Sequence, residues 1–258
     1  MRRLHLLEIE DQPWCPRAIR DGATDYLRLA MRLGRAYESV AARLREAVER
    51  AGAPRIVDLC SGGGGPWPRL IDVLDRHGDP VDVVLTDRYP NREALREVQR
   101  LAKGRVAFCA EPVDASRIPS ELEGFRTLFT SFHHFRPAEA QAILRDAVST
   151  RQGIGVFEIQ QRSLRSLLMI PPNFLMVLLV TPFLRPFRWS RLLWTYVLPA
   201  IPTMVVWDGI VSCLRTYTPA ELREMTDGFG DAGYVWEIGQ QRGGVGPAPI
   251  TYLVGRPA

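Results

Sequence analysis

The sequence has few of the features that mark secreted, zinc-binding or nucleic-acid-binding proteins. Its four cysteines are widely separated, at Cys15, Cys60, Cys109 and Cys213. They form no CxxC pair, so we expect no zinc site and no other metal. The first residues turn acidic at Glu8, before any apolar run long enough for a signal peptide. We therefore expect a reduced, cytoplasmic protein.

Blocks of like charge are also missing, and lysine is scarce beside arginine. Outside residues 161–218 there is no basic patch with interleaved aromatic side chains, so we expect no nucleic-acid partner. The 258 residues, 46% hydrophobic and 24% charged, suit one large globular domain.

Helices and strands alternate along the middle of the chain. Apolar residues at three- and four-residue spacing predict helical structure over 18–51, ended by Gly52-Ala53-Pro54. Strands are predicted at 55–59, 81–86, 105–110, 126–131 and 155–159, and helices at 66–77, 91–103 and 137–149. This order indicates parallel strands joined by crossover helices in a doubly wound, Rossmann-like α/β sheet.

The end of the chain follows a different pattern. A helix is predicted at 219–227, followed by strands 234–240 and 250–255 around a loop at 242–249. Two strands with no helix between them predict an antiparallel hairpin, which brings the sheet to seven strands. We divide the single domain into an N-terminal helical lid (1–53), a core (54–160), an apolar cap insertion (161–218) and a terminal helix and hairpin (219–258).

A glycine-rich loop follows the first predicted strand, in Asp58-Leu59-Cys60-Ser61-Gly62-Gly63-Gly64-Gly65. Glycines let the backbone turn sharply and let a ligand approach closely. The free amide groups of the following helix suit a carboxylate or a phosphate. Asp87 ends the second strand, where an acid can bind ribose hydroxyls, and Asp114-Ala115 follow the third strand, where an adenine amino group would lie.

These residues resemble the class I S-adenosylmethionine (SAM)-dependent methyltransferase family, over about 55–160 and the terminal hairpin. Ser131-Phe132-His133-His134-Phe135 looks like the fourth-strand motif of its ubiquinone and menaquinone branch, which tolerates cysteine where Cys60 replaces the first motif glycine. The resemblance implies SAM as the cofactor. It implies a binding site made of Asp58, Cys60, Ser61, Gly62, Gly64, Asp87, Arg88, Asp114, Ala115, Ser131 and Phe132.

Two other interpretations of the loop explain the sequence less well. A plain surface turn would not explain why Asp87, Asp114 and the terminal hairpin accompany it. A dinucleotide-binding enzyme needs a third glycine for close helix packing, and the corresponding positions hold Trp67 or Pro68.

Methyl transfer requires alignment of the reactants and exclusion of water, and a base where the acceptor must lose a proton. His133 and His134 are candidates because they follow the fourth strand and titrate near neutral pH, although packing or helix capping would also explain them. Asp208 and Tyr217 are further catalytic candidates. Asp208 is the lone acid among residues 161–218, where Arg215 could be its partner. Glu158 could face the cleft or cap a turn.

Residues 161–218 combine apolar stretches with basic charge. Six arginines against Asp208 give +5, while the whole chain carries +4. Prolines interrupt both uncharged stretches, 166–184 and 192–207, which argues against membrane spans. A cap over the cleft, a peripheral contact with a membrane and a homodimer face remain open.

We therefore expect a methyltransferase acting on a hydrophobic small molecule that is lipid-, quinone- or polyketide-like. The alternative is a non-catalytic protein of the same fold that binds a membrane or a protein partner through 161–218.

Overall fold

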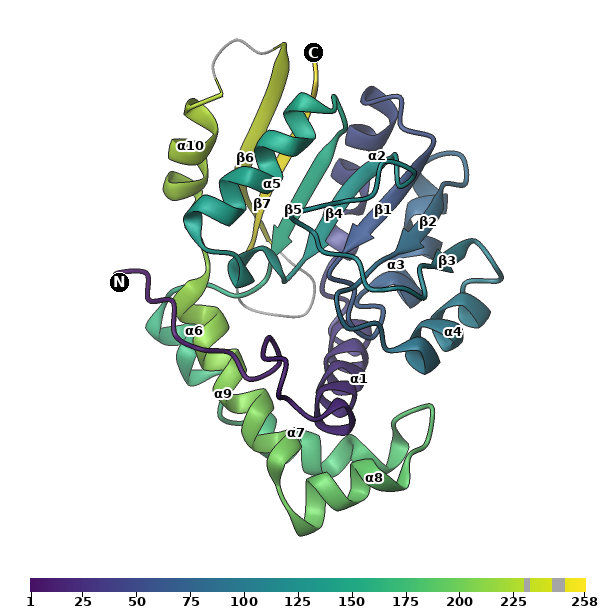
Figure 1. Cartoon of the computed structure of the whole chain (residues 1–258), viewed down its shortest axis with the longest axis vertical. Coiled ribbons are helices and arrows are strands. Elements are labelled where there is room, and N and C mark those ends of the chain that lie inside the picture. Colours follow the sequence, from purple (N-terminus) through teal and green to yellow (C-terminus); the bar gives the residue numbers. More distant parts are fainter. Residues whose placement is uncertain (230–232, 243–248) are drawn as a thin grey trace.

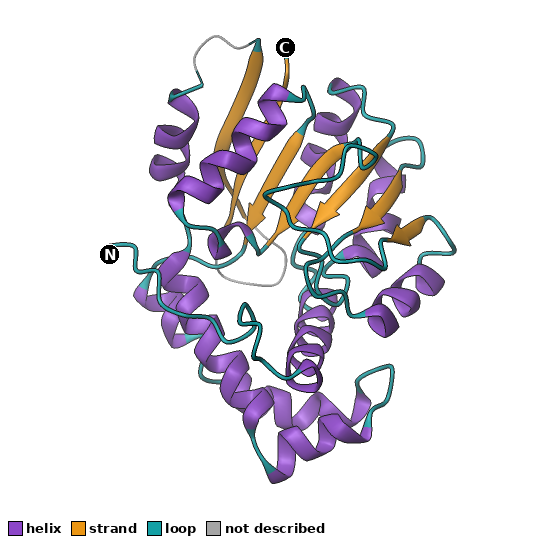
Figure 2. Cartoon of the chain, in the orientation of Figure 1, coloured by secondary structure: helices purple, strands orange, loops and turns teal. Residues whose placement is uncertain are grey.

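A computed structural model describes residues 1–229, 233–242 and 249–258, and it contains one seven-stranded sheet flanked by helices (Figure 1, Figure 2). The strand order is β3-β2-β1-β4-β5-β7-β6. The expected doubly wound α/β sheet with a C-terminal antiparallel hairpin is confirmed.

Five parallel strands form most of the sheet: β1 (Arg55–Leu59), β2 (Asp82–Leu85), β3 (Val106–Phe108), β4 (Phe125–Phe129) and β5 (Ile154–Glu158). All begin and end within about two residues of the predicted ranges. Neighbouring side chains point to opposite faces, so Ile56 packs in one core layer and Val57 in the other. The sheet is therefore buried on both sides, as its apolar strands require.

The last two strands, β6 (Tyr234–Arg242) and β7 (Pro249–Pro257), are antiparallel, and β7 pairs with β5. Most of the loop predicted between them, 243–248, lies outside the described residues.

Helices cover the two faces of the sheet unequally. Three of them, α2 (Ala41–Arg50), α3 (Trp67–Leu74) and α4 (Arg92–Leu101), contribute to the core layer that contains Ile56. The other layer receives α5 (Pro137–Ser149) and α10 (Pro219–Asp227). Both α5 and α10 span the predicted ranges because proline opens each helix and a glutamate at the third position bonds back to the cap residue.

The predicted helical range 18–51 contains two helices and a break whose position the pattern did not give. The first helix, α1 (Arg17–Leu33), ends at Gly34. Arg35 then takes a left-handed conformation with φ 50°, which breaks the helical path before the short turn Glu38–Val40 and α2. The polar and apolar spacing continues across this break, so the pattern alone did not reveal it.

The segment 161–218 forms four helices at one end of the molecule, away from the sheet (Figure 1). They are α6 (Leu164–Leu168), α7 (Asn173–Val180), α8 (Trp189–Leu192) and α9 (Ala200–Arg215), with a π-helical turn at Leu193–Val197. α1, α7 and α9 share a third apolar core that includes Ile19, Val177 and Met204. Within the described ranges no single helix could cross a membrane. By length and composition alone, the pair Trp189–Val197 and Ala200–Arg215, bent by 75°, could.

Candidate active site

A cleft of about 580 Å³ lies at the carboxyl ends of β1 to β4. The strand order reverses between β1 and β4, which is where ligands bind in open α/β sheets. Loops after all four strands line one side of the cleft. Residues 5–12 and the inner turns of α1 line the other side. Among residues 161–218, all of which the structure describes, only Arg215 lines the cleft.

The loop after β1 depends on unusual backbone conformations. Cys60 and Gly62 both have positive φ, of 56° and 54°. A Cβ on Gly63 would lie 2.9 Å from the Thr24 carbonyl oxygen, and one on Gly64 would lie 2.5 Å from Val98. The glycines therefore let α1 and α4 approach the loop closely. Cys60, Ser61, Gly62 and Gly63 line the cleft, whereas Gly64 faces α4.

Asp87 lines the cleft directly after β2 and holds the glycine loop in place. One carboxylate oxygen accepts a hydrogen bond from the Gly62 amide at 2.7 Å, and the other accepts one from the Tyr89 amide at 2.7 Å. Each oxygen keeps a second lone pair. The carboxylate can therefore accept two ribose hydroxyls without losing its own supports. Burial raises its pKa.

Asp58 supports the loop from beneath. Its carboxylate accepts hydrogen bonds from the Ser61 hydroxyl and the Thr127 hydroxyl, each at 2.6 Å. It is 2% exposed, and burial raises its pKa to about 6. Asp58 does not line the cleft, so its contact with a ligand would pass through Ser61.

The adenine-side residues also line the cleft, where Arg88, Asp114 and Ala115 come together. One Asp114 oxygen accepts hydrogen bonds from the amide and hydroxyl of Ser116. Ser131 lines the cleft as well, while its hydroxyl oxygen is buried and has no hydrogen-bond partner among the described residues. Phe132 is instead fully buried and packs on Tyr217.

Residues 3–12, which we call the N-terminal strap, close the acceptor side of the cleft by lying along α9. The Leu4 amide donates to the Leu214 carbonyl at 3.1 Å, and the Trp207 indole donates to the Leu7 carbonyl at 2.9 Å. The amides of Ile9 and Glu10 donate to the Asp208 carboxylate at 2.7 and 3.0 Å. Asp208 thus fastens the strap.

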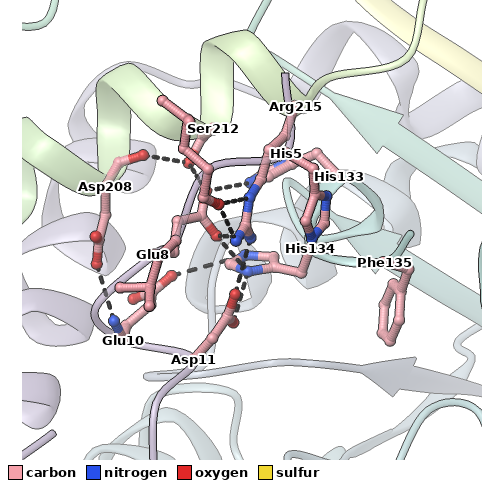
Figure 3. A network of polar contacts seen from close by, with 12 residues as sticks. His5, Glu8, Glu10, Asp11, His133, His134, Phe135, Asp208, Ser212 and Arg215 are labelled. Atoms are coloured by element: carbon pink, nitrogen blue, oxygen red, sulfur yellow. Dashed lines mark hydrogen bonds and ion pairs between the residues drawn. The ribbon is translucent and has the colours of Figure 1, made fainter. Parts of the chain in front are cut away.

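Two acids of the strap, Glu8 and Asp11, form a buried ion cluster with Arg215 and His134 (Figure 3). The Arg215 guanidinium lies 2.7 Å from Glu8 and 2.8 Å from Asp11, and His134 Nδ1 lies 2.7 and 2.8 Å from the same carboxylates. The two carboxylates raise the pKa of His134 well above its usual value, while the cations lower the pKa of Glu8 and Asp11. His134 lines the cleft, and this shift favours its imidazolium form over the neutral imidazole that a base requires.

The other predicted catalytic side chains lie behind the cleft wall. His133 is 1% exposed, and its Nδ1 is paired with Glu158 at 2.8 Å. The Tyr217 hydroxyl donates to the Phe135 carbonyl at 2.8 Å, and burial raises its pKa to about 12. Asp208 is 6% exposed, and burial raises its pKa to about 7. Arg215 pairs with the strap acids and not with Asp208.

Glu10 lines the cleft and was not foreseen as a site residue. Its carboxylate oxygen lies 3.6 Å from His134 Nε2, and burial raises its pKa to about 8. Glu8, Asp11 and Arg20 were also missed. The one signal in the sequence is the run of three acids in Glu8-Ile9-Glu10-Asp11. Arg215, which pairs with Glu8 and Asp11, lies more than 200 residues further along the chain.

Glu8, His133 and His134 also bring three potential metal ligands within 4.8 Å of one another. However, Arg215 and His134 already neutralise Glu8, and Ser212 donates to its other oxygen at 2.9 Å. We therefore describe the group as an ion cluster.

No protein-family model matches the chain, and no curated protein matches it by sequence. Solved structures do match. The plantazolicin methyltransferase BpumL in complex with SAH gives a TM-score of 0.60 at 11% identity, over 97% of this chain and 94% of that one. The fold is that of class I SAM-dependent methyltransferases.

Two further structures agree at lower similarity. The pyocyanin biosynthetic protein PhzM gives a TM-score of 0.51 at 17% identity. The O-methyltransferase NcsB1 from neocarzinostatin biosynthesis, with SAM and 2-hydroxy-5-methyl naphthoic acid, gives 0.50 at 16%. Each match covers 89% of this chain, which spans 57% and 55% of the two. None of these supports the ubiquinone and menaquinone branch specifically, which stays a prediction.

Proposed function

We propose that this chain is a SAM-dependent methyltransferase that methylates a small molecule with a largely apolar body. The observation that carries the proposal is the single cleft in which the Cys60–Gly63 loop, Asp87 and Asp114 line one half and the strap lines the other. Its volume lies in the range of ligand sites, which is about 300–1,000 Å³.

The cofactor half fits SAM in three respects. Asp87 offers a lone pair on each oxygen for the ribose, and Asp114 lies on the adenine side. The Cys60–Gly63 loop lines the same half, and its glycines let a ligand approach the backbone closely. SAM would supply a sulfonium-activated methyl group, which leaves the protein to position the acceptor and to exclude water.

The acceptor half combines apolar side chains with many charged ones. Leu6, Leu7, Leu27, Met31 and Phe135 provide the apolar surface. His134, held as a cation by Glu8 and Asp11, can donate from Nε2 to an acceptor oxygen. A partly anionic oxygen would be stabilised there.

Glu10, rather than His134, is the group we assign to proton removal. It lies beside His134 in the cleft, and a carboxyl with a pKa of about 8 exchanges protons near neutral pH. Turnover should therefore rise as the pH passes through about 8, and Glu10→Gln should abolish that rise. An unchanged pH profile in Glu10→Gln would remove Glu10 from the mechanism.

Calorimetry with SAM tests the function itself, followed by mass spectrometry of apolar phenols and acids incubated with protein and SAM. Micromolar SAM binding with methylated product supports the proposal. Binding without any product would favour the non-catalytic alternative, and no binding at all would end the assignment.

A further inference from the structure

The helices of the insertion expose an unusual amount of apolar surface. Seven large side chains of α6, α7, α8 and the turns that follow them are more than 60% exposed: Leu164, Leu168, Leu175, Leu179, Phe183, Trp189 and Val197. Apolar patches of this kind on a protein surface mark contact sites. We call these seven residues the outer face.

Helical spacing separates the outer face from the packed side of the same helices. Leu175, Leu179 and Phe183 follow one another at four-residue intervals, while Val177, between them, is fully buried against the third core. Trp189 and Val197 are eight residues apart and exposed, whereas Arg191 and Thr195 are buried. The insertion is therefore already packed on one side, and the outer face is a second, unpartnered surface.

Acids of α1 and α4 form ion pairs with arginines on the packed side of the insertion. Asp25 of α1 is fully buried between Arg188 and Arg191, and Arg188 also pairs with Glu93 at 2.9 Å. These ion pairs hold α8 against α1 and α4. They fix the position of α8, and α7 and α8 lie at the end of the molecule away from the sheet (Figure 1).

The exposed charges that the insertion itself contributes are of one sign, although Glu97 of α4 lines a small pocket together with Phe183 and Arg185. Arg165 and Arg185 are exposed, and neither forms an ion pair within the described parts of the chain. Asp208 is the sole acid among residues 161–218, and it is buried under the strap. The outer face therefore presents apolar side chains and unpaired guanidinium groups, with no carboxylate of its own.

Apolar side chains beside unpaired arginines favour some binding partners of the outer face over others. A second copy packed on the same face would bring arginines toward arginines, with no acid to pair them. A bilayer surface with anionic headgroups supplies both a medium for the apolar side chains and phosphates for the arginines. Exposed Trp189 suits the boundary between headgroups and acyl chains.

We propose that the outer face of α6–α8 docks the protein on an anionic lipid surface, with the apolar side chains inserted and Arg165 and Arg185 on lipid phosphates. The helices lie in the surface without crossing it. The cleft stays on the protein side, so docking is separable from SAM binding.

Flotation of the full-length chain with vesicles tests the proposal, comparing phosphatidylcholine alone with phosphatidylcholine containing phosphatidylglycerol. We expect binding to the anionic vesicles that weakens as NaCl rises. The double variant Phe183→Ser/Trp189→Ser should bind at least tenfold more weakly. Arg165→Glu/Arg185→Glu should lose the preference for anionic vesicles.

Matched controls lie on the opposite side of the molecule. Val235→Ser removes an apolar side chain that is 41% exposed on β6, and Arg145→Glu reverses an exposed charge on α5. Both should float like the wild type, and all variants should keep the wild-type SAM affinity and melting temperature.

Three outcomes would overturn the proposal. The first is that the protein floats with neither kind of vesicle. The second is that the control variants lose as much vesicle binding as the outer-face variants. The third is that light scattering shows a dimer that becomes a monomer in Phe183→Ser/Trp189→Ser. The last result would assign the face to a second copy. None of these outcomes bears on whether SAM binds in the cleft.

Discussion

The two halves of the cleft are built in different ways. The cofactor half consists of short loops that directly follow β1 to β4, and a local hydrogen bond from the Gly62 amide to Asp87 fixes the glycine loop. The acceptor half consists of a strap that holds no regular structure and is fastened by side chains about 200 residues away, such as Arg215 and Asp208. Strand ends provide geometry that local sequence specifies, whereas the strap depends on buried charge pairs formed only in the folded chain.

The largest effect on the free energy of unfolding is expected when Arg215, which pairs with Glu8 and Asp11 of the strap, is replaced. Arg215→Met leaves Glu8 buried with half its compensation, and breaking a buried ion pair in this way costs about 3–5 kcal/mol. Urea unfolding should show this loss, and acceptor turnover should fall further than SAM affinity.

The added substitution Glu8→Gln should restore part of that stability, because it removes the unpaired charge. Arg100→Met, which breaks an exposed pair with Glu97, should cost less than about 1 kcal/mol. If Arg215→Met were as mild as Arg100→Met, the strap would not depend on the ion cluster.

The cofactor half should respond to Asp87 instead. Asp87→Ala removes a charged acceptor and should weaken SAM binding by about 2–3 kcal/mol, or roughly 30- to 160-fold. Asp87→Asn keeps one acceptor oxygen and should fall between this variant and the wild type. Calorimetry measures both. Unchanged affinity in Asp87→Ala would contradict the site.

Glu10 sharpens the comparison through pH. Its pKa is raised from the usual value to about 8, so its contribution to stability is present below pH 4.5 and is lost as the pH rises through 8. Glu10→Gln does not titrate, and its stability relative to the wild type should therefore grow by about 1–2 kcal/mol between about pH 6.5 and 8.

Melting temperatures of the two proteins across this range give the measurement. A constant difference between them would mean that Glu10 titrates normally in the fold.

The smallest effect is expected at Cys60, where a residue with a side chain adopts φ 56°. Left-handed conformations cost about 1–2 kcal/mol for residues other than glycine, and glycine loses about 0.4–1 kcal/mol through its freer unfolded chain. Cys60→Gly should thus gain up to about 1 kcal/mol in thermal unfolding. Cys60→Ala keeps the strain and should show no gain. A Cys60→Gly variant that is no more stable than the wild type would contradict the strain at this position.

Local sequence patterns are enough to predict the sheet, the glycine loop and the two acids Asp87 and Asp114. These features depend on residue spacing and on which strand ends meet at one edge. The predicted ranges of α5 and α10 match the structure to the residue, because the proline and the glutamate that mark each helix start lie within four neighbouring positions. The position of the break between α1 and α2 could not be predicted, because Arg35 takes a left-handed conformation that arginine rarely adopts.

Only the tertiary structure decided the acceptor side. His134 reads as a neutral base in the sequence, and it becomes a cation because Glu8 and Asp11 reach it across more than 120 residues. Asp208 reads as a catalytic acid and instead holds two strap amides. Charge and hydrogen bonding depend on which groups share a buried volume, and long-range packing alone sets that.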